Sequence, residues 1–255
     1  MKSKVCLITG GAGFLGKKYC QFFLKKKYIV ICVDNNKKNL KSIKSLNLKN
    51  LKIYECDITK EKKVEKLFKL INKTYFVEVL INNAAIDAVP FKKRSNFQRF
   101  PDEKIWDDEM NVSLKGSFLM IKSFGEEMVK KKRGSIINIG SDLSVIAPNQ
   151  KIYKSSYKNY IKPVTYSVIK HGMLGLTKYF AALYGKYNIK VNMVSPGPIK
   201  NNQSKLLIEE LNDLIPMNRL GNPNEILGLL FFLSSLDSSY ITGQNILIDG
   251  GRTII

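Results

Sequence analysis

Residues 4–16, KVCLITGGAGFLG, decide the fold. An apolar run without polar alternation leads into glycines, as expected of a buried strand that ends in a turn. Gly11, Gly13 and Gly16 form the pattern G-x-G-x-x-G at this strand-to-helix turn. Glycines permit a tight turn and close backbone approach to a pyrophosphate, and the helix start offers free N–H groups and a partial positive charge. The stretch therefore predicts a dinucleotide-binding turn.

The rest of the chain continues this alternation of strand and helix. We expect strands over residues 4–10, 28–34, 51–57, 77–83, 134–140, 189–195 and 245–251. Helical periodicity falls between them, as over 14–27, 61–73, 102–132, 165–186 and 224–235. Several strands are apolar throughout, which is typical of parallel strands covered by helices on both faces. The pattern predicts an α/β fold: a doubly wound parallel sheet of about seven strands, which is a Rossmann fold.

No linker, repeat or low-complexity stretch divides the chain. Its 255 residues suffice for one large α/β domain with a substantial core. We expect a single domain over 1–255, with a nucleotide-binding half over about 1–140 and a catalytic and substrate half over about 141–255.

The formal net charge of +21 raises the question of nucleic-acid binding. Lysines outnumber arginines by 37 to 5, without the clustered arginines that grip phosphates in a fork. No helix-turn-helix, zinc-finger or RNP pattern is present. We expect no nucleic-acid partner, whereas an anionic small molecule or an acidic partner protein would suit this charge.

The remaining composition indicates a cytoplasmic protein without metal or membrane association. No apolar run reaches the roughly 18 to 20 residues that cross a bilayer. The apolar run near the N-terminus is too short for a signal peptide. The four cysteines lie in or beside apolar runs, as expected of buried, reduced thiols. His171 is the only histidine, and no pattern of metal-ligand spacing surrounds it.

Polar residues end the second, third and fourth predicted strands. Asp34 lies about 20 residues beyond the glycine-rich turn, where a carboxylate accepts hydrogen bonds from the adenosine ribose. Asp57 and Asn83 lie at the ends of the next two strands, on the same edge of the sheet. Because a carboxylate would repel the 2′-phosphate of NADP, Asp34 favours NAD, although the nearby Lys37 and Lys38 leave NADP open.

Seven motifs connect the chain to a known family. They are TGGAGFLG (9–16), CDIT (56–59), NNAA (82–85), IINIGS (136–141), YSVIK (166–170), SPGPI (195–199) and SSYITGQNILIDGG (238–251). In this order and spacing they resemble the short-chain dehydrogenase/reductase family over nearly the whole chain. The resemblance implies an NAD(P)-dependent oxidoreductase that acts on a secondary alcohol or ketone. It implies cofactor contacts from Gly10, Gly13, Phe14, Leu15, Gly16, Asp34, Asp57, Ile58, Asn83, Ala84, Ala85, Tyr166, Lys170, Pro196, Gly197 and Ile199.

The same resemblance implies a catalytic set of Ser141, Tyr166 and Lys170. Tyr166 and Lys170 are four residues apart and project from one face of a helix. A tyrosine hydroxyl titrates near pH 10, so a neighbouring ammonium group and the oxidised nicotinamide would be needed to stabilise its phenolate. Ser141 follows a strand and would hydrogen-bond the reacting oxygen. Tyr166 would then act as general acid and base, with Lys170 as its activator.

Two positions depart from the family pattern. Phe14 stands where the family usually has a third glycine, which implies a shifted loop with binding retained. The family's catalytic asparagine lies in a V-N-L-x-G pattern, whereas this chain has VSLKG over 112–116, with Ser113 at that position. Asn111 lies two residues earlier, about 200° round an α-helix. We expect Ser113 to be the functional counterpart, in a modified proton relay.

The substrate is the least determined part of the prediction. Between Ser141 and Tyr166 lie more residues than the family usually has, and this insertion at about 145–162 is rich in tyrosine and lysine. It forms either a wall of the substrate pocket, with tyrosines for sugar rings and lysines for phosphates, or a solvated loop. Residues 200–216 are expected to form a mobile lid. The substrate is expected to be sugar-like or anionic.

The insertion, the ITGGAGFLG start and the NNQ after PGPIK are similar to a subgroup linked to bacterial surface-glycan biosynthesis, in which nonulosonic acids are made for flagellin or polysaccharide. The leading interpretation is an oxidoreductase of a sugar, sugar phosphate or nucleotide sugar. The alternatives are a 3-oxoacyl-carrier-protein reductase and a catalytically silent dinucleotide-binding module. The family resemblance also implies a homotetramer or homodimer formed through the two long helices and the C-terminal strand.

Overall fold

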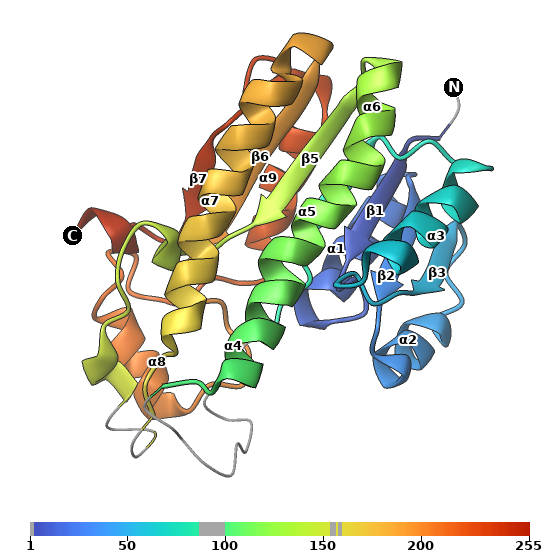
Figure 1. The fold of residues 1–255 in the computed structure, drawn as a ribbon. Helices are drawn as coiled ribbons and strands as arrows, with labels where there is room; N and C mark the ends of the chain where they lie inside the picture. Colours follow the sequence, from blue (N-terminus) through green and yellow to red (C-terminus); the bar gives the residue numbers. More distant parts are fainter. Residues whose placement is uncertain (1–2, 87–99, 154–156, 158–159) are drawn as a thin grey trace.

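The computed structural model describes residues 3–86, 100–153, 157 and 160–255, and it centres on one sheet of seven strands (Figure 1). The strand order is β3-β2-β1-β4-β5-β6-β7, and every neighbouring pair is parallel. The order changes direction between β1 and β4, which creates the crevice where open α/β sheets bind ligands. The strands are Val5–Thr9 (β1), Ile29–Asp34 (β2), Leu51–Glu55 (β3), Val79–Asn82 (β4), Gly134–Ile139 (β5), Ile189–Pro196 (β6) and Asn245–Ile248 (β7).

Helices cover both faces of this sheet (Figure 1). One face carries α3, the run from α4 to α6, and α7, whereas α1, α2 and α9 pack on the other. The α-helices are Phe14–Lys25 (α1), Lys37–Lys44 (α2), Glu61–Asn72 (α3), Glu103–Met110 (α4), Gly116–Met120 (α5), Glu126–Lys131 (α6), Val164–Tyr184 (α7), Lys205–Asn212 (α8) and Glu225–Ser234 (α9). Two π-helical segments, Asn111–Lys115 (η1) and Ile121–Gly125 (η2), join α4, α5 and α6.

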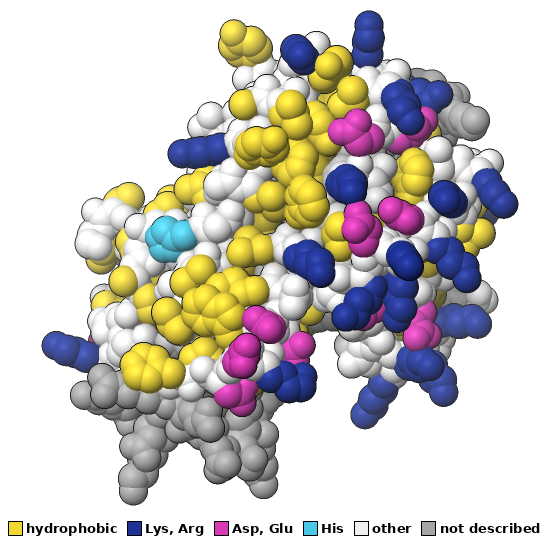
Figure 2. Space-filling model, viewed as in Figure 1, with side chains coloured by type: hydrophobic (Ala, Val, Ile, Leu, Met, Phe, Trp, Pro, Cys, Tyr) yellow, Lys and Arg dark blue, Asp and Glu magenta, His cyan; other side chains and the backbone are white. Residues whose placement is uncertain are grey.

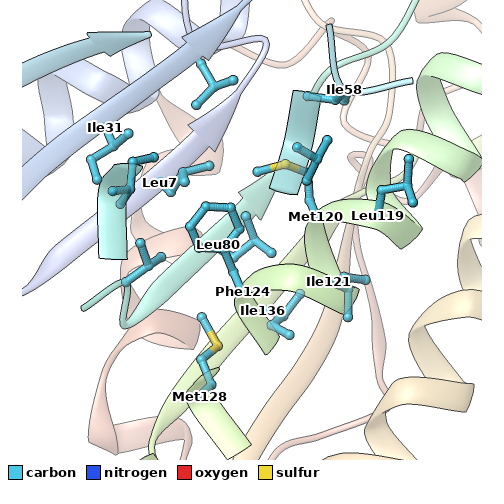
Figure 3. Packing of buried hydrophobic residues seen from close by; sticks show 14 of the residues in the cluster. Leu7, Ile31, Ile58, Leu80, Leu119, Met120, Ile121, Phe124, Met128 and Ile136 are labelled. Carbon is cyan, nitrogen blue, oxygen red and sulfur yellow. The ribbon is translucent and has the colours of Figure 1, made fainter. Parts of the chain in front are cut away.

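The apolar strands supply two cores because alternate side chains point to opposite faces of the sheet. Leu7 lies in the core under α3, α5 and α7, whereas its neighbours Cys6 and Ile8 lie in the core under α1 and α9. Figure 3 shows the first of these cores, in which Phe124 from η2 packs beside Leu80 of β4. Burial on both faces explains why these strands lack polar alternation.

The predicted α/β Rossmann fold is confirmed, and each of the seven expected strands is present within a few residues of its predicted range. The helix expected over 102–132 is interrupted by η1 and η2. Residues 37–44 and 205–212 form α2 and α8, which were not among the expected helices. The division into a nucleotide-binding half and a catalytic half stays a prediction.

Among the helices that the structure describes, none is both long and apolar enough to cross a bilayer. The described residues also contain no group of three or more His, Cys, Asp or Glu placed to hold a metal ion.

Candidate active site

A cavity of about 630 Å³ lies along the carboxyl ends of the parallel strands, at the predicted ligand edge of the sheet. Of the predicted site residues, Gly16 and Ser113 lie outside its lining. The others line it: Gly10, Gly13, Phe14, Leu15, Asp34, Asp57, Ile58, Asn83, Ala84, Ala85, Ser141, Tyr166, Lys170, Pro196, Gly197 and Ile199. Their assignment to cofactor and substrate stays a prediction.

The glycine-rich turn at one end of the cavity requires its glycines. Gly10 has φ +60°, and a methyl group there would lie 2.8 Å from the Cα of Ala84. A methyl group at Gly16 would lie only 2.1 Å from the carbonyl oxygen of Gly10, so Gly16 shapes the turn from behind without reaching the cavity. Gly13 is the N-cap of α1 and has no side chain to occupy the first N–H groups of the helix. Those groups are suited to the oxygens of a phosphate.

Asp34 connects the end of β2 to this turn. Its Oδ2 accepts a hydrogen bond from the backbone N–H of Ala12 over 3.1 Å, and its Oδ1 accepts one from Asn36 over 2.9 Å. Each carboxylate oxygen has two lone pairs, so both retain capacity for hydroxyl donors in the cavity. Asp34 therefore fixes the turn, and its contact with a ribose stays a prediction.

Asn83 anchors the end of β4 to the same turn. Its side-chain Nδ2 donates to the carbonyl oxygens of Thr9 and Gly10 over 3.0 and 3.2 Å. The hydroxyl of Thr9 in turn accepts from the backbone N–H groups of Asn83 and Ala84. These bonds fix the backbone of the NNAA segment against the glycine-rich turn.

Asp57 lies beyond the end of β3 and remains a carboxylate at neutral pH. Its Oδ1 accepts from the hydroxyl of Thr59 over 2.7 Å and from the Thr59 N–H over 3.1 Å. Desolvation, the largest single effect, raises the pKa of Asp57, but these hydrogen bonds together with the charges of Lys63 and Lys60 outweigh it and lower the pKa.

The predicted catalytic pair lies on the first turns of α7. Tyr166 and Lys170 both line the cavity, and Nζ of Lys170 lies 5.4 Å from the centroid of the Tyr166 ring. Lys170 is buried and donates a hydrogen bond to the carbonyl oxygen of Ile139, the last residue of β5, over 3.2 Å. Ser141 follows this strand and lines the cavity with them. The end of β5 thus brings Ser141 and Lys170 to one side of the cavity.

Ser141 is held by a buried ion pair that sequence patterns do not single out. Its hydroxyl donates to Oδ1 of Asp142 over 2.7 Å and accepts from the N–H of Leu143 over 3.2 Å. Oδ2 of Asp142 is paired with the guanidinium of Arg252, and these side chains are only 4% and 7% exposed. Both residues line the cavity, although 110 positions separate them in the sequence.

Ser113 lies on the π-helical segment η1 and is buried, whereas its neighbour Val112 lines the cavity. The N–H of Gly116 bonds to the carbonyl oxygen of Asn111, five residues earlier, as in a π-helix. The angular offset expected from α-helical spacing therefore does not describe this segment. A catalytic role of Ser113 stays a prediction.

The insertion contributes both to the cavity lining and to a small core, which consists of Ile152, Leu207, Leu211, Ile215 and Leu220. Tyr153 and Lys162 line the cavity, whereas Tyr160 is buried and makes an edge-to-face contact with Tyr153, with ring centroids 4.9 Å apart. Residues 154–156 and 158–159 lie outside the described part of the chain. Part of the expected lid over residues 200–216 also contributes to this core: from α8, Leu207 and Leu211 pack against Ile152, and both line the cavity.

The chain matches a family model described as enoyl-(acyl carrier protein) reductase over residues 12–253. It is 33% identical to an NAD-dependent glycerol dehydrogenase of Listeria innocua, over 98% of this chain and 94% of that protein. A 3-oxoacyl-acyl-carrier-protein reductase of Thermotoga maritima is 34% identical, over 100% of this chain and 99% of that protein. A short-chain dehydrogenase of Leptospira borgpetersenii, solved with bound NAD+, superposes with a TM-score of 0.87 at 32% identity, over 99% of this chain and 94% of that one.

These relatives span the chain almost from end to end, so the likeness includes both the glycine-rich turn and the segment around Tyr166. The chain belongs to the short-chain dehydrogenase/reductase family and is an oxidoreductase that acts on CH–OH groups.

Proposed function

We propose that the chain is an NAD-dependent oxidoreductase of a secondary alcohol or ketone carried by a sugar-like, anionic substrate. The observation that carries this proposal is that one and the same cavity is lined by the glycine-rich turn, by Asp34 and by Ser141, Tyr166 and Lys170. A dinucleotide bound at the glycine-rich turn would extend along this cavity, with its reactive ring beside an acid and base.

The turn and its surroundings fit a dinucleotide. The absence of a side chain at Gly10 lets the turn pack closely against Ala84, and the first N–H groups of α1 follow this turn, where a pyrophosphate is favoured. Asp34 would hold the adenosine ribose and would repel a 2′-phosphate, which supports NAD over NADP. The Listeria innocua relative is likewise NAD-dependent. The segment Pro196–Ile199 would face the nicotinamide, which supplies or accepts the hydride when bound.

Tyr166 would take the proton of the substrate hydroxyl during oxidation and return it to the carbonyl oxygen during reduction. Lys170, buried beside the ring, would favour the phenolate through its positive charge and would hold the nicotinamide ribose. Ser141 would fix the reacting oxygen. The backbone carbonyl of Ile139 and the carboxylate of Asp142 orient Lys170 and Ser141 for these roles.

The polyol substrate of the Listeria innocua relative supports a sugar-like substrate for this chain, and the cavity-facing Tyr153 would supply a stacking surface. The assignment to surface-glycan biosynthesis stays a prediction. A 3-oxoacyl-acyl-carrier-protein reductase is the second candidate, favoured by the Thermotoga maritima relative. The net charge of +21 would suit its acidic carrier protein.

A homotetramer or homodimer would bury an apolar face. Figure 2 shows apolar side chains gathered over α7 and the neighbouring helices. Phe118 on α5 is 42% exposed, and Tyr179 and Leu183 on α7 are 64% and 43% exposed. An apolar face of this kind is typical of contacts between subunits, so the proposed assembly forms through these two helices.

The test is an assay with NAD(H) and NADP(H) against polyols, sugar phosphates, nucleotide sugars and a 3-oxoacyl thioester. We expect turnover of a hydroxylated, anionic substrate with NAD and a loss of more than about 100-fold in kcat for Tyr166→Phe, as typical for a general acid–base group. Tyr240→Phe, which removes the same hydroxyl group from a fully exposed tyrosine, is the control. Preference for the thioester would favour the second candidate. Sound cofactor binding without any turnover would favour the silent module.

A further inference from the structure

The charges that line the cavity are segregated. Among the described lining residues, the carboxylates at the dinucleotide end are Asp34 and Asp57, at the ends of β2 and β3. The catalytic end carries three cations, Lys162, Lys170 and Arg252, against the single carboxylate of Asp142. Because Asp142 and Arg252 form an ion pair, the two lysines set the local charge. An anionic substrate is therefore favoured at the catalytic end and not at the other.

Of the two lysines, Lys162 is the one that faces an incoming substrate. Its Nζ lies 3.7 Å from the centroid of the Tyr166 ring, on the ring face, where the π-electrons attract a cation. Lys170 is 7% exposed and donates to the backbone of β5, whereas Lys162 belongs to the insertion and is half-buried at the cavity wall. The ammonium group of Lys162 therefore lies over the tyrosine whose hydroxyl would move the substrate proton.

The backbone of Lys162 is fixed in this position. The side-chain amide of Gln150 accepts a hydrogen bond from the Lys162 N–H over 2.9 Å and donates one to its carbonyl oxygen over 3.1 Å. Pro163 follows and is the N-cap of α7. Because Gln150 and Lys162 lie near opposite ends of the insertion, this clamp closes the loop and holds the lysine against the start of the catalytic helix.

We propose that Lys162 is a specificity-determining residue that binds an oxyanion of the substrate, a carboxylate or a phosphate, carried close to the carbon that bears the reacting oxygen. The inference rests on the proposed function, since it takes Tyr166 to be the proton-transfer group. An ammonium group binds an oxyanion as a point charge, so it accepts both a carboxylate and a phosphate. An oxyanion that accepts from this ammonium group lies on the side of Nζ away from the Tyr166 ring, which restricts substrates to those with charge and carbonyl close together.

A binding experiment tests the subsite without requiring the natural substrate. Inorganic phosphate is titrated by calorimetry into the NAD-saturated protein, so that the cofactor blocks the pyrophosphate cradle, at 0.15 M NaCl to screen surface lysines. The variants are Lys162→Gln and Lys162→Arg, with Lys151→Gln as the matched control because Lys151 is exposed in the same insertion. We expect Lys162→Gln to weaken phosphate binding by about 10- to 100-fold, the loss of one charge-assisted hydrogen bond.

Lys162→Arg and Lys151→Gln are expected to bind phosphate within about threefold of the wild type. Equal losses in Lys162→Gln and Lys151→Gln, unchanged binding in Lys162→Gln, or no phosphate binding by the wild type would each overturn the subsite. Failure of the wild type to bind NAD would instead count against the proposed function itself, because the NAD titration precedes the phosphate titration.

Kinetics with a matched pair of ketones separate a substrate subsite from an effect on Tyr166. Acetoacetate and methyl acetoacetate share one reacting ketone and differ in charge. An oxyanion subsite predicts that Lys162→Gln raises KM for acetoacetate by about tenfold or more and leaves methyl acetoacetate unchanged. If kcat falls equally for both ketones and the alkaline limb of the pH profile moves upward, Lys162 acts through the tyrosine and the subsite is rejected.

Discussion

The hydroxyl of Ser141 donates its hydrogen bond to Oδ1 of Asp142 over 2.7 Å, so the orientation of the predicted catalytic serine is set by its immediate neighbour in the sequence. Asp142 is in turn fixed by Arg252 from the C-terminal segment. A hydroxyl has one proton to donate. While Ser141 donates to Asp142, it has no second proton for a substrate oxygen, so the proposed bond from Ser141 to the reacting oxygen requires its hydroxyl to rotate away from Asp142.

Replacing Asp142 by Asn should destabilise the protein because it leaves the guanidinium of Arg252 buried without its counter-charge. Breaking a buried pair from one side costs about 3 to 5 kcal/mol of unfolding free energy. The double variant Asp142→Asn with Arg252→Met removes both charges and should recover more than half of that loss. Urea unfolding followed by circular dichroism at pH 7 measures both values. A double variant less stable than Asp142→Asn would show that the two charges do not act as a pair.

Replacing Gly16 by Ala should abolish dinucleotide binding. The added methyl group would lie 2.1 Å from the carbonyl oxygen of Gly10 and must displace the turn. Gly228 in α9 is the matched control, because a methyl group there has no neighbour within 4 Å. Gly228→Ala should keep NAD affinity and raise the unfolding free energy by about 0.5 to 1 kcal/mol, the helix-propensity difference. Fluorescence titration with NADH and urea unfolding measure the two quantities, and retained affinity in Gly16→Ala contradicts the prediction.

Truncating Ile152 to Ala should impair substrate binding more than cofactor binding. Ile152 is buried against Leu207 and Leu211, and these contacts join the insertion to α8 at the cavity wall. Large-to-small changes in such cores cost about 2 to 5 kcal/mol of unfolding free energy. In a small peripheral cluster this loss can appear as local separation of α8 from the insertion at the cavity wall. We expect KM for substrate to rise severalfold with an unchanged Kd for NADH. Leu70→Ala, at an exposed position of α3, is the control.

The apolar strands and the glycine-rich turn could be predicted because their signals are local: apolar runs, and glycines at a strand end. The breaks η1 and η2 carry no such signal, since the pattern of buried residues continues through them. The pairing of Asp142 with Arg252 depends on where two distant segments meet, which no local pattern states. In the insertion, Tyr153 and Tyr160 have the same composition-based signal, and only packing determines that Tyr153 lines the cavity whereas Tyr160 is buried outside its lining.

Ser113→Ala tests whether the serine at the family's asparagine position contributes to proton transfer. If its hydroxyl holds a relay to Lys170, removing it should lower kcat by about 100-fold, which is at the low end for a lost proton-transfer group, with an unchanged Kd for NADH. The loss of one oxygen atom from a buried site changes packing little. Asn111→Ala is the control and should retain kcat. An unchanged kcat in Ser113→Ala, or a larger loss in Asn111→Ala, would reject the predicted exchange of roles.

The loop beside the cavity is held by Glu225 and should be weakened by acid. Arg219 forms two hydrogen bonds with Glu225, of 2.9 and 2.7 Å, and Glu225 also accepts from the N–H of Asn222 over 2.6 Å. The hydrogen bonds from Arg219, followed by that from Asn222, lower the pKa of Glu225 from 4.5 to about 2. These contacts fix the loop in which Gly221 pairs with Ile199, the residue predicted to face the nicotinamide.

A carboxylate whose pKa is lower in the folded than in the unfolded state stabilises the protein above the unfolded value and loses that contribution as protons bind the folded form. The stabilisation by Glu225 is therefore present above about pH 4.5 and declines towards pH 2. Its size is reduced by solvent screening because both side chains are partly exposed. Urea midpoints of the wild type and Glu225→Gln should differ at pH 6 and converge as the pH falls towards 2. A difference that is constant over this range would mean that Glu225 stabilises the loop without its charge.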